Sequence, residues 1–236
     1  MTGTVVIDER FCGPPGSANG GYACAMAAQW LDGPAEVTLR SPPPLGAPLR
    51  IERPDGRVAL FDGDVLVAEG RPATVDVEPP AATSADEARR ASERYPWRDR
   101  HPYPTCFVCG PRREAGDGMR IFPGPVDDGS LYAATWTPEA SLAGGDGKVR
   151  DEFVWGSLDC PGGIVTDLFG EVGRILLGRL TADLRRPVIA EREHVLQAWP
   201  IAREGRKLHT ATALRTAGGE LCAVARAVWI ELPRGT

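Results

Sequence analysis

Gly13-Pro-Pro-Gly-Ser-Ala-Asn-Gly-Gly-Tyr22 and Leu158-Asp-Cys-Pro-Gly-Gly163 are the two most informative stretches of this sequence. Both are rich in turn-forming residues and contain a Gly-Gly pair near their end. Each is followed by a run of small or apolar residues long enough for a helix, from Ala23 to Leu31 and from Ile164 to Leu177. An Asn before the first pair is a favourable N-cap, and a Pro before the second suits a first helical turn. The two stretches therefore predict two helices that each begin at a Gly-Gly pair.

A similar pattern of predicted strands follows each helix. Alternating apolar segments are separated by turn signals such as Pro54-Asp55-Gly56. The predicted strands are 37–42, 49–53, 57–61 and 64–77 in the first half, and 182–187, 194–202, 206–214 and 220–232 in the second. One helix followed by a meander of about four strands, twice over, favours a helix wrapped by an antiparallel sheet over a parallel α/β sheet. The expected fold class is α+β, with a long central helix in each of two units.

In this interpretation the chain divides into an N-terminal unit at residues 1–78, a linker at 79–129 and a C-terminal unit at 130–236. The linker is rich in Pro, Ala and charged residues, and a short helix is expected from Ser84 to Glu93. An irregular segment with a Cys-x-x-Cys motif follows this helix.

The segment Asn19-Gly-Gly-Tyr22, placed before a helix of small residues, resembles the opening of the central helix in hotdog-fold thioesterase-like proteins. The duplication resembles the double-hotdog acyl-CoA thioesterases, over residues 4–77 and 130–232. The resemblance implies a tandem (double) hotdog fold and a substrate that is an acyl-CoA or acyl-carrier thioester. The segment Pro104-Thr-Cys-Phe-Val-Cys-Gly-Pro111 is not part of the general pattern of this superfamily.

The resemblance also implies where a thioester would bind. In these proteins the N-terminus of the central helix polarises the thioester carbonyl, because unpaired N–H groups and the positive end of the helix dipole stabilise a developing oxyanion. The matching substrate-binding positions are Gly20, Gly21, Gly162 and Gly163. A Gly-Gly pair can equally serve only to pack a helix closely on a sheet, and both interpretations stay open.

Three side chains are candidates for catalysis. Asp159, expected at the entrance to the second helix, could act as a general base or could only cap that helix. Asp167, a turn further along the same predicted helix, is the alternative acid. Asn19 could bind substrate or water, or could only serve as an N-cap. Spacing does not select a counterpart of the Asp, Thr and Gln set of the better-known double-hotdog enzymes among Thr166, Thr181, Gln197 and Thr210.

The expected reaction is hydrolysis of the thioester by water that a carboxylate activates. One alternative is a protein that binds an acyl ligand without catalysis. Another is a hydratase or dehydratase on the same fold, which would normally pair a His with an Asp near the helix start. No His stands near either Gly-Gly pair in the sequence, which argues against hydration.

The motif Cys106-x-x-Cys109, with His101 nearby, has the spacing of half a tetrahedral zinc site. A redox pair and plain structural thiols are the alternatives, and we expect no cofactor. Cys12, Cys24, Cys160 and Cys222 could supply further thiols in space. Cys160 could also act as a nucleophile if the predicted helix start lowered its pKa.

The overall composition excludes several classes of function. Asp and Glu outnumber Lys and Arg by 32 to 27, and no basic run exceeds a pair, so no nucleic-acid partner is expected. No apolar run approaches the roughly 20 residues needed to cross a bilayer, and residues 1–10 do not read as a signal peptide. We therefore expect a cytoplasmic protein with reduced cysteines. Two fused units would replace a dimer of single units, so a monomer or homodimer is expected.

Overall fold

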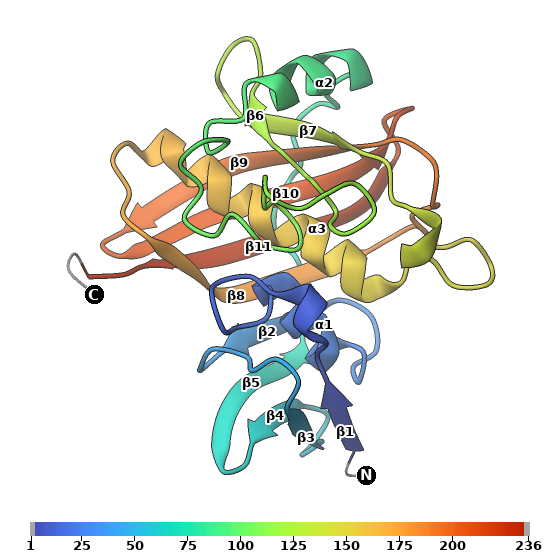
Figure 1. Ribbon diagram of the computed structural model, residues 1–236, viewed down its shortest axis with the longest axis vertical. Coiled ribbons are helices and arrows are strands. Elements are labelled where there is room, and N and C mark those ends of the chain that lie inside the picture. The colour runs from blue at the N-terminus through green and yellow to red at the C-terminus, as the bar shows by residue number, and fades with distance from the viewer. Residues whose placement is uncertain (1–2, 234–236) are drawn as a thin grey trace.

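The computed structural model describes residues 3–233, which form an 11-stranded antiparallel sheet with two main helices (Figure 1). Residues 1, 2 and 234–236, at the outer ends of the two expected units, lie outside the described residues. In order across the sheet, the strands are β1 (Gly3–Val6), β3 (Pro48–Glu52), β4 (Val58–Asp62), β5 (Val65–Pro72), β2 (Ala35–Leu39), β8 (Ile175–Leu184), β11 (Leu221–Glu231), β10 (Lys207–Thr216), β9 (His194–Glu204), β7 (Tyr132–Trp136) and β6 (Gly124–Pro125). The predicted α+β class with an antiparallel sheet is confirmed.

The first helix, α1 (Gly20–Ala28), begins where the sequence predicts it. The side chain of its N-cap, Asn19, accepts a hydrogen bond of 2.9 Å from the N–H of Tyr22. Nearly every residue of α1 is small and buried, so this helix can lie deep in the molecule between its neighbours.

The second main helix, α3 (Asp151–Ile164), begins earlier than predicted. Asp151 and Glu152 occupy its first turn, where acidic side chains complement the positive end of the helix dipole. Gly162 and Gly163 lie in its last turn, so the prediction that they open a helix is wrong. Asp159 lies inside the helix, so its predicted place at the helix entrance is wrong as well.

The run that follows these glycines is also not the predicted helix. A short 3-10 helix, η3 (Val165–Phe169), continues from α3 and ends at Gly170, whose φ of 88° suits glycine. The strand β8 then begins at Ile175. Asp167 therefore lies in the 3-10 segment and not within a second central helix.

The two halves of the sheet join between β2 and β8, where Ala35 pairs with Ala182 and Thr38 with Arg179. Figure 1 shows α3 lying across the strands of the C-terminal half, with α1 close to its side. An aromatic cluster joins the two helices, since the ring of Phe11 stacks on Tyr22 at 4.4 Å and meets Phe153 at 5.7 Å.

The linker contains the predicted short helix, α2 (Ala85–Glu93), with Ser84 as its N-cap. The fully buried side chain of Gln197 on β9 holds the chain that leads to this helix. Its Nε2 donates to the carbonyl of Ala81 at 2.8 Å and to Oγ1 of Thr83 at 3.1 Å, and its Oε1 accepts from Arg215 at 2.9 Å.

We expect Gln197→Leu to lower the free energy of unfolding by about 2 kcal/mol, because it removes the hydrogen bonds that this fully buried side chain makes with Ala81, Thr83 and Arg215. Urea denaturation would measure this change. Gln29→Leu, at an exposed position after α1, is the matched control and should shift stability by less than about 0.5 kcal/mol. Equal effects of the two variants would contradict the assigned role of Gln197.

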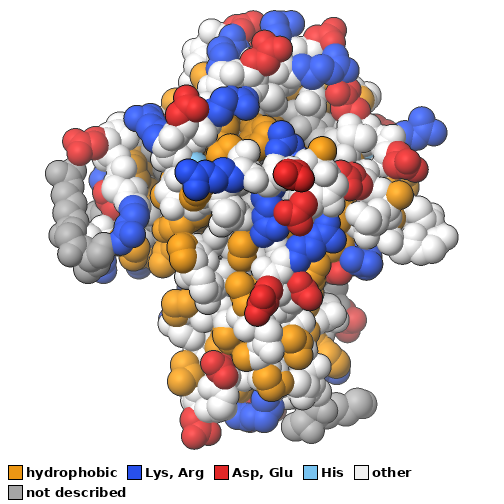
Figure 2. Space-filling view, in the orientation of Figure 1, with side chains coloured by type: hydrophobic (Ala, Val, Ile, Leu, Met, Phe, Trp, Pro, Cys, Tyr) orange, Lys and Arg blue, Asp and Glu red, His pale blue; other side chains and the backbone are white. Residues whose placement is uncertain are grey.

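Acidic and basic side chains alternate over the face drawn in Figure 2, without a large patch of one sign. Among residues 3–233, no helix is long and apolar enough to span a bilayer.

Candidate active site

A cavity of about 360 Å³ lies where the first turn of α1, the end of α3, the start of β8 and the end of β11 meet the linker. Its apolar wall includes Ile175, Leu177 and Trp229. Residues from the sequence-based candidates also line it: Asn19, Gly20, His101, Cys106, Cys109, Asp159, Cys160 and Gly163. The structure thus collects residues from both halves and the linker around one space.

The carboxylate of Asp159 is 2% exposed and is held on one side only. Its Oδ2 accepts from Nδ2 of Asn19 at 2.9 Å and from the backbone N–H of Gly21 at 2.8 Å. Its Oδ1 has no hydrogen-bond partner within the described part of the chain. Burial raises the pKa of Asp159 to about 7, and the negative charge on Cys106 adds to the rise, although the Gly21 and Asn19 donors oppose it.

Asn19 is the predicted N-cap, and it also holds Asp159, a role that the sequence did not indicate. Its Oδ1 caps α1, while its Nδ2 orients the carboxylate of Asp159. The N–H groups of Gly21, Tyr22 and Ala23 are all occupied, whereas that of Gly20 has no hydrogen-bond partner among residues 3–233. Gly20 also lines the cavity, so this donor is available at the positive end of α1.

Asp167 is not among the residues that line the cavity. Both of its carboxylate oxygens accept from the indole N–H of Trp97, at 3.0 and 3.2 Å. Burial raises the pKa of Asp167, and the hydrogen bond from Trp97 opposes the rise. The structure therefore places Asp159, and not Asp167, in the lining of the cavity, and one oxygen of Asp159 has no partner among residues 3–233.

Close packing constrains all four predicted substrate-binding glycines, since a Cβ on Gly20 would lie 2.9 Å from the side chain of Leu177. A Cβ on Gly21 would lie 2.5 Å from Cβ of Asp159, where α1 crosses α3. A Cβ on Gly162 or Gly163 would lie 2.9 Å from Thr210 or from the Trp229 ring, because α3 packs tightly on β10 and β11. Gly162 and Gly163 lie inside α3 where the helix contacts the sheet. The local sequence does not reveal this contact.

None of the Thr and Gln candidates lines the cavity. The hydroxyl of Thr166 donates to the carbonyl of Gly163, and that of Thr181 to Glu36. Gln197 holds the linker, as described above. This set therefore contributes no residue to the lining of the cavity that holds Asp159.

Three buried cysteines meet beside Asp159. The Sγ atoms of Cys106, Cys109 and Cys160 all lie within 4.8 Å of one another, and those of Cys106 and Cys160 are 3.7 Å apart. Hydrogen bonds from the other two thiols lower the pKa of Cys106, whereas the pKa values of Cys109 and Cys160 are raised. Of the four cysteines considered as additional ligands, the structure thus brings Cys160 to the pair.

His101 also lies beside these cysteines, although it is far from both Gly-Gly pairs in the sequence. Its Nε2 lies 3.2 Å from Sγ of Cys109, and its Nδ1 accepts from the N–H of Tyr103 at 2.8 Å. Burial lowers the pKa of His101, which favours the neutral ring.

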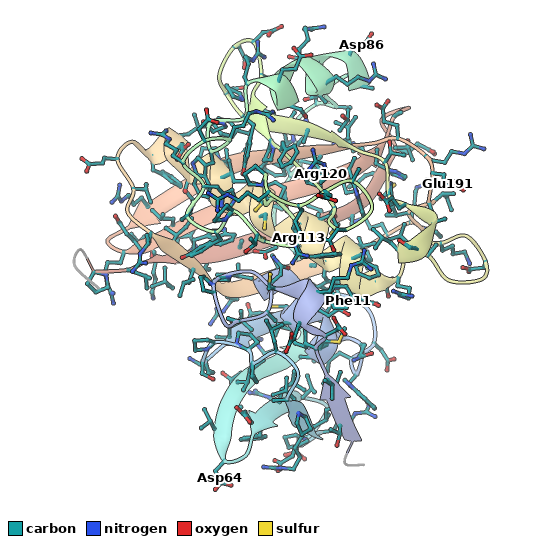
Figure 3. The ribbon with its side chains drawn as sticks, in the orientation of Figure 1. Phe11, Asp64, Asp86, Arg113, Arg120 and Glu191 are labelled. Atoms are coloured by element: carbon teal, nitrogen blue, oxygen red, sulfur yellow. The ribbon has the colours of Figure 1, made fainter. Side chains whose placement is uncertain are left out.

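The loop that carries the Cys-x-x-Cys motif is tied to the N-terminal half by Arg113 (Figure 3). The guanidinium of Arg113 donates to the carbonyl of Arg10 at 2.8 Å and to Sγ of Cys12 at 3.0 Å, and it pairs with Asp117 at 2.8 Å. Cys12 is thus engaged away from the cluster.

Comparison with known proteins shows likeness at the level of the fold. No family model matches the sequence, and no curated protein matches it. A solved putative thioesterase from Novosphingobium aromaticivorans superimposes with a TM-score of 0.65 at 13% identity, over 98% of this chain and 96% of that one. The tesB protein of Mycobacterium avium subspecies paratuberculosis gives 0.64 at 12% identity, over 98% and 93% of the two chains. An acyl-CoA thioesterase II from Mycobacterium marinum gives 0.60 at 15% identity, over 100% and 94%. The resemblance to hotdog-fold thioesterases is confirmed as a likeness of fold along the whole chain.

Proposed function

We propose that this protein hydrolyses an acyl thioester, such as an acyl-CoA or an acyl-carrier thioester, with Asp159 as general base. One observation carries the proposal: Asp159 lines an apolar cavity, and one of its carboxylate oxygens has no hydrogen-bond partner among the described residues, while the other is fixed by Asn19 and Gly21. A carboxylate in such a setting can bind and deprotonate a water molecule.

In the proposed reaction, a water bound to Oδ1 of Asp159 attacks the thioester carbonyl carbon and gives its proton to the carboxylate. A C–O bond forms, and negative charge develops on the carbonyl oxygen. The free N–H of Gly20 and the positive end of α1 stabilise that charge. The C–S bond then breaks, and the proton on Asp159 passes to the departing thiolate, which yields a free thiol and a carboxylic acid.

The cavity supports an acyl substrate because its wall is mainly apolar and its volume of about 360 Å³ lies in the range of small-molecule sites. The solved structures named above include an acyl-CoA thioesterase II, which makes acyl-CoA the first substrate class to test.

We also propose that the fold is a tandem hotdog, with units at 1–78 and 130–236 joined by a linker at 79–129. Outward from the central β2–β8 pair, the strand order is β5, β4, β3, β1 on one side and β11, β10, β9, β7 on the other. The isolated bridges Cys12–Ala18 and Ala143–Val149 precede α1 and α3 at equal spacing, since 143 minus 12 and 149 minus 18 both give 131. These matches support a duplication in a register different from the one that pairs the two Gly-Gly motifs.

In this corrected register, the start of α1 at Gly20 corresponds to the start of α3 at Asp151. Asp151 and Glu152 would repel a developing oxyanion, whereas the Gly20 N–H would attract it. We therefore propose one active site, at the start of α1. A monomer or homodimer of the double unit and a location in the cytoplasm remain part of the proposal.

The competing functions differ in what an assay would detect. A hydratase would need His101 as acid or base, but its Nδ1 accepts from Tyr103 and its Nε2 faces Cys109. A non-catalytic protein would bind acyl-CoA and leave it intact. Hydration would appear as a change in enoyl-CoA absorbance without free thiol.

We expect the purified protein to release free thiol from at least one member of a panel of short, medium and aromatic acyl-CoAs, measured with a thiol reagent. Chemical hydrolysis in heat-inactivated protein provides the baseline. Saturable binding of an acyl-CoA by calorimetry, without thiol release from any panel member or from acyl-carrier substrates, would overturn the proposed hydrolysis.

A further inference from the structure

We propose that Cys106, Cys109 and Cys160 bind one Zn²⁺ ion as thiolates, with the fourth position of the metal facing the cavity. The three sulfur atoms converge from two separate parts of the chain. Cys106 and Cys109 lie in the irregular linker, and Cys160 lies in the last turns of α3. All three are buried and line the same cavity.

The separations of the sulfur atoms suit a tetrahedral ion. With Zn–S bonds of about 2.3 Å, two ligand sulfurs of a tetrahedral site lie about 3.8 Å apart. The Sγ atoms of Cys106 and Cys160 are 3.7 Å apart, and every pair in the cluster is within 4.8 Å. A pair at the upper limit of 4.8 Å would have to close by about 1 Å to reach a common ion.

The surroundings of the sulfurs are those of metal-bound thiolates. The amide of Asn19 points its Nδ2 at Sγ of Cys160 at 3.5 Å and at Sγ of Cys106 at 3.9 Å. Such N–H donors offset the charge of thiolate ligands and fix their orientation.

The net charge of the site also fits its position. Three thiolates and one Zn²⁺ leave a single negative charge, and the carboxylate of Asp159 beside them adds a second when it is ionised. Donors from Asn19 and the positive end of α1, whose first residue Gly20 lines the same cavity, face that charge. Each thiol gives up its proton when the metal binds, so uptake of zinc releases protons to the solvent.

His101 supports the thiolates from outside the metal and does not bind it. Because Nδ1 of His101 accepts the N–H of Tyr103, the neutral ring carries its proton on Nε2. That proton is directed at Sγ of Cys109, 3.2 Å away. The fourth ligand therefore comes from the cavity, where a water molecule would complete the tetrahedron.

Other states of the three cysteines are conceivable, and the metal content of the protein distinguishes them from a zinc site. Cys106 and Cys160 could instead form a disulfide, or the three thiols could stay free. A soft thiolate set could also take copper or iron. Zinc is favoured because three separate thiolates and one exchangeable position form a known zinc arrangement.

The first test is elemental analysis of protein produced with zinc in the medium and purified without chelators. We expect about one zinc per chain in the wild type and less than about a tenth of that in Cys106→Ser. Cys222→Ser, at a buried cysteine on β11 outside the cavity lining, should keep its zinc. Stoichiometric copper or iron in place of zinc would overturn the proposal.

Cobalt substitution of the wild type tests the same site without a variant that could misfold. We expect thiolate-to-cobalt charge-transfer absorption together with the d–d bands of tetrahedral Co²⁺, and His101→Gln should retain both. Metal-free wild type that takes up neither zinc nor Co²⁺ under reducing conditions would refute the site. Loss of the bands in His101→Gln would refute the cavity-facing fourth position.

Metal content is measured without any thioester, so it is independent of the proposed hydrolysis. A protein that binds zinc but releases no thiol would retain the metal site and refute the hydrolysis. A zinc-free protein that hydrolyses acyl-CoA would refute the metal site and retain the proposed hydrolysis. Removal of the metal should also lower Tm by at least about 5 °C, since the ion ties the linker loop to α3.

Discussion

Asp159→Asn is expected to lower kcat for thioester hydrolysis by about 100-fold or more, because an amide cannot accept the proton of the attacking water. The substitution keeps the shape of the side chain. Its carbonyl oxygen can still accept from Asn19 and Gly21, as Oδ2 of Asp159 does. KM should change little, since the variant alters neither the apolar wall nor the free N–H of Gly20. Steady-state thiol release with the best panel substrate measures both constants.

Asp167→Asn is the matched control for this prediction. It makes the same chemical change at a carboxylate that does not line the cavity and that can still accept from the indole of Trp97. We expect less than about a threefold change in kcat, well below the range for loss of a general base. A large loss in Asp167→Asn, together with full activity in Asp159→Asn, would assign the base to the other carboxylate.

Most strands and turns of this fold could be predicted because their signals are local, although the strand predicted at 182–187 is in fact β8 at Ile175–Leu184. The Asp55-Gly56 hairpin has φ values of 47° and 72°, which the Asp-Gly pair tolerates well. Asn19 could likewise be identified as a helix cap from its type and its position before small residues. Even the short helix α2 in the linker followed from its cap, Ser84, and from its composition.

The second helix was misplaced because its local and tertiary signals conflict. Pro161, Gly162 and Gly163 resemble a helix start, but they occupy the last turn of α3. The glycines are needed there because Thr210 and Trp229 leave no space for a Cβ. Contact with strands that lie far ahead in the sequence cannot be read from the motif itself.

The candidate site was predicted in its residue types better than in its arrangement. Asn19 and Asp159 were both candidates, yet they are 140 residues apart, and no local pattern indicates that one would orient the other. The sequence also did not distinguish Cys160 from three other cysteines as the neighbour of Cys106, 54 residues away. The crossing of α1 and α3, with the linker loop packed against it, brings these groups together.

Gly21→Ala is expected to destabilise the protein by about 3 kcal/mol, at the upper end for overpacking of a core. A Cβ at this position would lie 2.5 Å from Cβ of Asp159 and 2.7 Å from the backbone oxygen of Trp155. Backbone atoms of a packed helix cannot rotate away, so α1 and α3 would have to separate. The gain in helix propensity from Gly to Ala, about 1 kcal/mol, offsets only part of this cost.

Gly156→Ala is the control for this prediction. It lies on α3 at the same helix crossing, but there is space for its Cβ. A Cβ there meets its nearest neighbour, a methyl of Val108, at 3.4 Å, which is ordinary van der Waals contact. This variant should be as stable as the wild type or more stable by up to about 1 kcal/mol. Urea denaturation of both variants measures the difference. If Gly21→Ala proved as stable as Gly156→Ala, the two helices could not cross as closely as described. The hydrogen bond from Gly21 that holds Asp159 would then lose its geometric basis.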